Sequence, residues 1–129
     1  MKLRPREHVR DDAGHSSSAI TDKYIDIELR DNMEDKEYLN VLNKSLKDLN
    51  KYTFDFVFYV AGVDIHHEDR LGKLKITDEG INKRDQIVIE NFYSKNIPLC
   101  GVLGGGYNKS FDKLIELHSM LHKNCAEYF

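Results

Sequence analysis

Two β-rich apolar runs, at residues 54–60 and 97–103, are separated by a long segment of helical character. Both runs are almost wholly apolar, which is typical of strands covered on both faces in a parallel sheet. The helix between them is expected over 77–95, because it opens on a capping threonine followed by two acids that favour the positive end of the helix dipole. A connection of this length joins parallel strands by a right-handed crossover. The sequence therefore predicts a βαβ unit within a layered α/β sheet.

Two further helices are expected on either side of this unit, over 34–50 and 110–128. Each segment places its apolar side chains on a single helical stripe. The stripes are Tyr38, Leu39, Leu42, Leu46 and Leu49 in the first helix, and Phe111, Leu114, Ile115, His118, Leu121 and Cys125 in the second. The predicted order is helix, strand, helix, strand, helix.

The first 22 residues show neither helical nor strand periodicity. They mix charges with three consecutive serines, so we expect a loop or disordered arm over 1–22 and the α/β unit over 23–129. Within the second range, the alternation at 24–29 predicts a short edge strand or an extended lead-in.

The composition excludes several classes of protein. A chain of 129 residues is long enough for one domain, and 19 basic against 22 acidic residues leave a formal charge of −3. That balance argues against a nucleic-acid-binding protein, which would carry a basic excess. No apolar run is long enough to span a bilayer, and the N-terminus lacks the apolar stretch of a secretory signal. Cys100 and Cys125 stand apart, as reduced thiols do in a cytoplasmic protein, which is the location we expect.

Candidate functional residues follow the two predicted strands. Asp64 lies four positions beyond Val60, and Tyr107 four beyond Leu103, so neighbouring parallel strands would bring both to one rim of the sheet. An aspartate there can bind Zn²⁺, and a tyrosine hydroxyl can donate to an oxyanion. Gly104, Gly105 and Gly106 would let a substrate chain approach the backbone closely. The alternatives are a turn-capping aspartate and a simple tight turn.

Several motifs occur in a fixed order: VAGVD at 60–64, DRLG at 69–72, KRD at 83–85 and GGGY at 104–107. Together they resemble the C-terminal part of the zinc-dependent histone deacetylase family, which includes the acetylpolyamine amidohydrolases. The similarity is greatest to the class IV branch and its bacterial relatives. It implies the C-terminal portion of a three-layer, parallel-sheet fold of the arginase and deacetylase type, beginning near Tyr24, with residues 1–22 as a disordered or non-family arm.

The resemblance also implies roles for individual residues. Asp64 matches the last of three zinc ligands, whose other two come from an Asp-x-His pair at another strand end. Tyr107 matches the tyrosine that polarises the acetyl carbonyl, and Asp69 matches a loop acid to which we assign a bracing role. A His-His pair upstream supplies the general base and acid in the family.

We count no Asp-x-His pair in the chain and no match to the upstream His-His pair, so two of the three zinc ligands and the general base are expected to be missing. His66 and His67 lie in the metal-ligand loop, where we expect solvated side chains. His118 and His122 have i,i+4 spacing, but no HExxH acid accompanies them, so we place them at the core edge. We therefore expect zinc in the intact family and none on this chain alone.

Three hypotheses about function follow. The first is a truncated deacetylase-family protein, a C-terminal fragment inactive by itself. The second is one half of a split enzyme, active when an N-terminal deacetylase fragment joins it. The third is a non-catalytic interaction module that uses an exposed sheet edge. We also expect the isolated chain to self-associate or to be only marginally folded, because a cut sheet exposes apolar surface.

Overall fold

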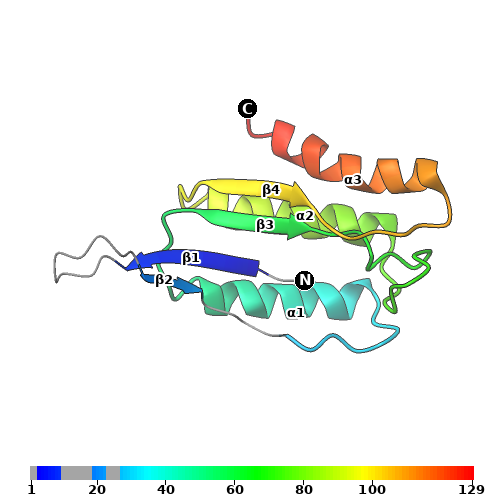
Figure 1. Ribbon diagram of the computed structural model, residues 1–129, viewed down its shortest axis with the longest axis horizontal. Coiled ribbons are helices and arrows are strands. Elements are labelled where there is room, and N and C mark those ends of the chain that lie inside the picture. The colour runs from blue at the N-terminus through cyan, green and yellow to red at the C-terminus, as the bar shows by residue number, and fades with distance from the viewer. Residues whose placement is uncertain (1–2, 10–18, 23–26) are drawn as a thin grey trace.

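The computed structural model describes residues 3–9, 19–22 and 27–129 (Figure 1). In chain order its elements are β1 (Leu3–Val9), β2 (Ala19–Asp22), α1 (Asp35–Leu49), β3 (Val57–Ala61), α2 (Asp78–Tyr93), β4 (Leu99–Leu103) and α3 (Phe111–Ala126). The helix, strand, helix, strand, helix order predicted from Glu34 onward is confirmed, with each boundary within a few residues of the expected one.

The strands β3 and β4 are parallel neighbours, paired from Val57 with Leu99 to Ala61 with Leu103. The helix α2 connects them, so the predicted βαβ unit is present. Because the strands run in register, their carboxyl ends finish side by side, and the loops that follow begin at one rim of the sheet (Figure 1).

The N-terminal segment differs from the expectation. The structure has strands at Leu3–Val9 and Ala19–Asp22, where the sequence predicted a loop or disordered arm. The strand β1 pairs antiparallel with both β2 and β3, giving the sheet order β2-β1-β3-β4. Residues 10–18 lie outside the described part, as do 23–26, which hold half of the predicted strand at 24–29; residues 27–29 are described and form no strand. A strand formed by long-range pairing leaves little local signal, which explains why periodicity missed β1.

One side of β3 forms the main hydrophobic core. Val57, Tyr59 and Ala61 are buried there against side chains from all three helices. The helical members of this cluster are Leu42, Leu46 and Leu49 of α1, Val88, Ile89 and Phe92 of α2, and Leu121 of α3. All three helices therefore cover the same face of the sheet.

The other side of β3 is open. Phe56, Phe58 and Val60 alternate with the buried residues and are exposed. The expectation that this run is covered on both faces is therefore wrong for the chain as it stands. Of the three layers implied for the whole fold, the described residues form two, the sheet and the helices on one face.

The helix starts are tied to one another. Thr77 caps α2 by accepting a hydrogen bond from the Gly80 amide at 3.1 Å, as its sequence position predicted. Asp35, the first residue of α1, accepts hydrogen bonds from the Thr77 amide at 2.8 Å and from its hydroxyl at 2.5 Å. A Cβ at Gly80 would lie 2.3 Å from an Asp35 carboxylate oxygen and 2.7 Å from Ile76 Cγ2, so a larger residue there would displace these side chains. None of the described helices is long and apolar enough to cross a membrane.

Candidate functional site

The loops that follow β3 and β4 meet at the carboxyl rim of the sheet. The Val63 amide donates to the Gly105 carbonyl at 2.7 Å, which joins the first loop to the glycine turn. Below this contact, Val63 and Ile65 are buried in a second core cluster with Met33, Tyr38, Ile76, Ile81 and Leu117. The loop is therefore anchored by alternating apolar side chains, and this alternation leaves Asp64 exposed between two buried neighbours.

The Asp64 carboxylate lies between Gly62 and Gly105. A Cβ built at Gly62 would be 3.0 Å from one carboxylate oxygen, and one at Gly105 would be 3.0 Å from the other. The carboxylate borders a cavity of about 220 Å³, whose lining residues are Tyr38, Val60, Gly62, Asp64, Ile65, Arg84 and Gly105. The structure thus places Asp64 against the glycine turn, as its position after the strand predicted.

Gly72 packs closely against the backbone carbonyl of Asp64. A Cβ at Gly72 would lie 1.7 Å from the Asp64 carbonyl oxygen, a distance that no side chain tolerates. The Gly72 amide also donates to Asp69 at 2.8 Å. The glycine of the DRLG motif is therefore required because only a residue without a Cβ leaves room for the Asp64 carbonyl.

The three glycines of the turn are needed for contacts within the chain. A Cβ at Gly104 would lie 2.7 Å from the Gly62 Cα, and one at Gly106 would lie 2.7 Å from Val63 Cγ2. We attributed these glycines to the approach of a substrate chain. The close approach that the structure shows is that of the loop carrying Asp64.

Asp69 braces both loops. One carboxylate oxygen accepts from the amides of Leu71 and Gly72 at 2.9 and 2.8 Å, and the other accepts from the Tyr107 amide at 2.6 Å. Partial burial alone would raise the pKa of Asp69, but these three backbone donors outweigh it and hold the pKa below its ordinary value. The geometry is that of a loop brace, as we assigned.

Tyr107 is held through its backbone and leaves its side chain accessible. Its amide donates to Asp69, and its carbonyl accepts from the Arg70 amide at 3.1 Å. The residue is 55% exposed and does not line the cavity at Asp64. The structure therefore brings the turn to the rim, while the phenol stays outside the cavity.

A buried charged pair, which the sequence analysis gave no role, lies directly beneath the site. Arg84 and Asp85 are both almost fully buried, and Arg84 Nε donates to Asp85 at 3.0 Å. Arg84 Nη1 donates to the Gly62 carbonyl at 2.5 Å, and the Tyr59 hydroxyl donates to Asp85 at 2.5 Å. The helix α2 thereby holds the start of the loop that carries Asp64. Arg84 and Asp85 belong to the KRD motif at 83–85, which the sequence analysis noted without assigning it a function.

The surroundings of Arg84 keep its guanidinium charged. Burial by itself lowers the pKa of Arg84, but Tyr59, Asp85 and Tyr38 outweigh it and raise the pKa above its ordinary value. Burial raises the pKa of Tyr59 well above its ordinary value, so its hydroxyl stays protonated and available as a donor. A fixed cation therefore forms part of the wall of the Asp64 cavity.

His66 is buried, which corrects the expectation of a solvated loop side chain. It is 0% exposed, and its Nε2 lies 2.7 Å from an Asp78 carboxylate oxygen. Its Nδ1 accepts from the Glu68 amide at 3.3 Å and lies 3.2 Å from the Asn108 side-chain amide. Because Nδ1 is an acceptor, Nε2 carries the proton and donates to Asp78. His66 thus joins the first loop to the start of α2 and to the residue after the glycine turn.

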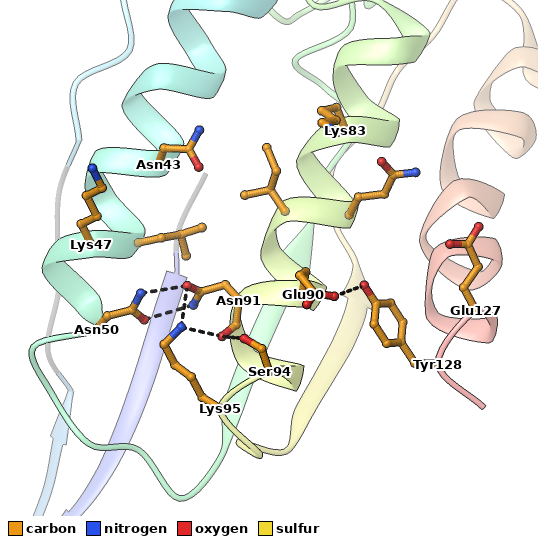
Figure 2. Close-up of a pocket in the computed structure, with 13 residues that line it drawn as sticks. Asn43, Lys47, Asn50, Lys83, Glu90, Asn91, Ser94, Lys95, Glu127 and Tyr128 are labelled. Atoms are coloured by element: carbon orange, nitrogen blue, oxygen red, sulfur yellow. Dashed lines mark hydrogen bonds between the residues drawn. The ribbon is translucent and has the colours of Figure 1, made fainter.

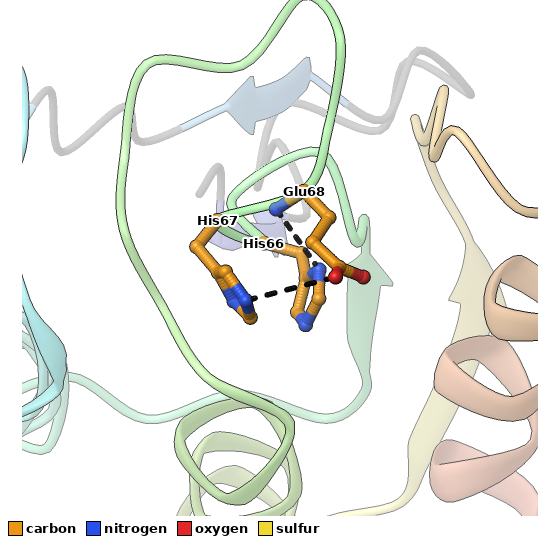
Figure 3. A group of neighbouring side chains, drawn as sticks. All are labelled: His66, His67 and Glu68. Atoms are coloured by element: carbon orange, nitrogen blue, oxygen red, sulfur yellow. Dashed lines mark hydrogen bonds and ion pairs between the residues drawn. The ribbon is translucent and has the colours of Figure 1, made fainter.

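Asp64-Ile65-His66 has the Asp-x-His spacing, so our expectation that the chain contains no such pair is wrong. This pair does not supply a ligand set, because both ring nitrogens of His66 are engaged and His66 does not line the Asp64 cavity. Ligand atoms of His66, His67 and Glu68 lie within 4.8 Å of one another (Figure 3). Because both ring nitrogens of His66 are already hydrogen-bonded, only His67 and Glu68 of this group could act as metal ligands.

The donor set at the Asp64 cavity does not fit a zinc ion by itself. A catalytic zinc site has three protein ligands, and the lining residues offer one carboxylate, with the Arg84 cation in the wall. The described residues that line this cavity therefore provide one carboxylate.

His118 and His122 border an apolar groove of about 380 Å³ along α3 that no carboxylate lines. Burial lowers the pKa of the half-buried His118, which keeps its ring neutral. Neither lines the Asp64 cavity. His118 Nε2 lies 3.4 Å from the Cβ position of Gly106 in the glycine turn, whereas His122 is exposed.

A hollow of about 690 Å³ lies among α1, α2 and the end of the chain (Figure 2). Part of its polar lining is paired internally. Asn50 and Asn91 exchange hydrogen bonds at 2.8 and 3.1 Å between α1 and α2, and the Tyr128 hydroxyl donates to Glu90 at 2.5 Å. This hollow is formed by helix-to-helix contacts and shares no lining residue with the Asp64 cavity.

Comparison with known proteins identifies similar chains. A model of the histone deacetylase domain matches residues 3–121, a range that includes most of the segment we had set apart as a non-family arm. An uncharacterized protein of Picosynechococcus sp. is 38% identical over 106 residues, which cover 81% of this chain and 35% of that protein. Histone deacetylase 2 of Arabidopsis thaliana is 38% identical over 96 residues, which cover 72% of this chain and 25% of that protein. The chain thus spans about a third to a quarter of the length of these relatives.

Proposed function

The chain belongs to the histone deacetylase family, and from that premise we propose that it supplies part of an acetyl-amide hydrolase site. Its contribution is the Asp64 carboxylate, as one metal ligand, and the turn that carries Tyr107. The remaining metal ligands and the general base come from residues beyond those at this rim. On this proposal the chain alone does not hydrolyse acetyl-amides.

One observation carries the proposal: the two family loops are locked together at the rim. Val63 bonds to Gly105 at 2.7 Å, and Asp69 bonds to the Tyr107 amide at 2.6 Å. These contacts hold the Asp64 carboxylate against the glycine turn, with Gly72 behind its backbone. Bonds of this kind preorganise a site before a substrate arrives.

The chemistry available to the chain's own residues is limited. The Tyr107 hydroxyl donates a hydrogen bond to the acetyl oxygen as that oxygen gains negative charge. Asp64 offers a carboxylate ligand, and Arg84 holds the Gly62 carbonyl and thus the loop on which Asp64 lies. The two described cysteines form no disulfide, which supports a cytoplasmic setting for the assembled protein.

The test is complementation. The complementing polypeptide is the part of the Picosynechococcus protein outside its match to this chain, expressed separately. Mixed with this chain and zinc, it is expected to hydrolyse an acetyl-lysine peptide, which neither component does alone. Tyr107→Phe should lower turnover by about 10²–10³-fold, the cost of one oxyanion donor. Tyr93→Phe, an exposed tyrosine on α2, should leave turnover unchanged.

Two results would contradict the proposal: turnover by this chain alone that is lost with Tyr107→Phe, or turnover by the mixture that survives it. A non-catalytic binding role is the second candidate, favoured by the open side of β3. A stable complex without hydrolysis would support that role in place of the first.

A further inference from the structure

We propose that the hollow between α1 and α2 is a binding groove for an extended, acidic peptide segment of another protein. Its volume of about 690 Å³ lies in the range of clefts that bind ligands. The hollow shares no lining residue with the Asp64 cavity, so this inference does not depend on the proposed function.

The hollow has an apolar floor and polar walls. Leu46 of α1 is buried in the main core, and Ile87 of α2 is partly buried against it. The side chains around this floor end in carboxamide, hydroxyl or ammonium groups, and they come from α1 and from α2 with the two residues that follow it (Figure 2). They are Asn43, Lys47, Asn50, Lys83, Gln86, Asn91, Ser94 and Lys95.

Three lysines give the part of the hollow between α1 and α2 its positive charge. Lys47 and Lys83 are exposed and make no hydrogen bond or ion pair with another described residue. The Lys95 ammonium donates to the carbonyl and side-chain oxygens of Asn91 at 3.0 and 3.3 Å, which leaves its third N–H free. An acidic segment would supply the counter-charge that these ammonium groups lack, as basic clusters do for acidic motifs.

The two acids of the lining lie toward the end of the chain. Glu90 accepts a hydrogen bond from the Tyr128 hydroxyl at 2.5 Å, on the side of α2 that faces α3 (Figure 2). Glu127 caps the end of α3. Among the described residues, the lining on α1 and on the facing side of α2 therefore consists of cations and neutral groups.

The carboxamides of the walls can bind a peptide main chain. Asn50 and Asn91 exchange one hydrogen bond in each direction, and each amide nitrogen carries two N–H groups, so each side chain keeps one donor. Asn43 and Gln86 have both their donors and their acceptors available. Peptide carbonyl and N–H groups match these donors and acceptors.

The spacing of the lysines indicates an extended segment. Lys83 and Lys95 are 12 positions apart along α2 and its end, which corresponds to about 18 Å. An extended peptide covers that distance with about six residues. A nucleic-acid backbone is the less suitable polyanion, because the chain carries a formal charge of −3 and places only three lysines in this lining.

The first experiment measures binding of the fluorescein-labelled peptide EELEEE by fluorescence anisotropy. Lys47→Glu combined with Lys83→Glu should weaken binding by at least about tenfold, because two attractive contacts become repulsive. The matched control combines Lys75→Glu with Lys123→Glu, which changes the net charge equally at exposed positions outside the hollow, and it should bind like the unaltered chain. Circular dichroism checks that both variants fold. The peptide EESEEE should bind at least about threefold more weakly, because it lacks the apolar side chain for the floor.

A second measurement needs no variant. Addition of the unlabelled peptide should shift the side-chain amide NMR signals of Asn43, Asn50 and Gln86, which line the hollow. The internal control is Asn124, which is buried and donates to the Asn82 side chain at 2.8 Å, and its signals should not move.

Four results would overturn the inference. They are no binding of EELEEE, equal binding by the charge-reversed pair, equal binding of the basic peptide KKLKKK, and shifts that spare the amides of the hollow. A single-stranded oligonucleotide that binds more tightly than the peptide, and depends on the same two lysines, would also overturn it, because the hollow would then select a phosphate backbone.

Discussion

The carboxylate of Asp69 accepts a hydrogen bond from the backbone amide of Tyr107 at 2.6 Å, between residues 38 positions apart in the chain. The same side chain holds the amides of Leu71 and Gly72. One aspartate thus fixes the loop after β3 and the turn after β4 relative to each other, and several expected outcomes follow from this arrangement and from its neighbours.

Replacing Asp69 should destabilise the fold. Asp69→Ala removes the acceptor for three backbone amides, and we expect the free energy of unfolding to fall by about 2–3 kcal/mol. Urea denaturation measures this change. Glu68→Ala, at the exposed neighbour, is the control and should change stability by less than about 0.5 kcal/mol. Equal effects of the two substitutions would show that Asp69 is not a brace.

The contribution of Asp69 should depend on pH. Its pKa is lowered in the folded chain, so its stabilisation is fully present above the ordinary carboxyl value and is lost as pH falls through the lowered folded pKa. The difference in unfolding free energy between the unaltered chain and Asp69→Asn should therefore be constant near neutral pH and shrink below about pH 4. Denaturation at a series of pH values tests this. A difference that grows on acidification would contradict the direction of the pKa shift.

Gly72 should not tolerate a side chain. Gly72→Ala places a methyl group 1.7 Å from the Asp64 carbonyl oxygen, so the backbone that carries the carboxylate must move. We expect a loss of at least about 2 kcal/mol in stability and altered amide NMR shifts at Asp64 and Gly105. Lys73→Ala, at an exposed neighbour, should do neither. Unchanged shifts at Asp64 in folded Gly72→Ala would refute this packing argument.

The buried pair beneath the site should be costly to break. Arg84→Met removes the cation that pairs with the buried Asp85, and we expect a loss of about 3–5 kcal/mol. Adding Asp85→Asn should recover part of that loss, because a neutral amide then replaces the buried carboxyl group that has lost its partner. Lys83→Met, exposed on the same helix, should be near neutral. A double variant no more stable than Arg84→Met would show that the penalty has another origin.

The isolated chain should hold no stoichiometric zinc at neutral pH. The Asp64 cavity offers one carboxylate, fewer than the three protein ligands of a catalytic site, and the ring nitrogens of His66 are already engaged. Elemental analysis after dialysis measures the metal content. About one zinc per chain that disappears in Asp64→Ala would contradict this expectation.

The central elements were predictable because their signals are local. Apolar periodicity located α1, α2 and α3, and the two apolar runs located β3 and β4. The same reasoning placed Asp64 and the glycine turn at one rim, where the structure has them. It could not find β1, because pairing with β3 depends on residues more than 50 positions away.

The buried polar residues were unpredictable for a related reason. His66 lies among charged and polar neighbours, which predicts a solvated side chain. In the structure, Asp78 and Asn108 from distant segments contact its ring nitrogens at hydrogen-bond distance. Arg84 likewise reads as part of a charged helix surface, and its partners Tyr59 and Gly62 come from β3 and the loop after it. Burial of such groups depends on partners that only the tertiary structure supplies.

The long-range hydrogen bonds at the rim also affect the order in which parts of the chain fold. The bonds from Asp35 to Thr77, from Asp69 to Tyr107 and from His66 to Asn108 span 42, 38 and 42 residues. Each must close a long loop before it contributes, whereas the helices gain hydrogen bonds within a single turn. The rim should therefore order last on folding and open first on partial unfolding. Amide exchange around Asp64 would then proceed through local opening while α2 remains protected.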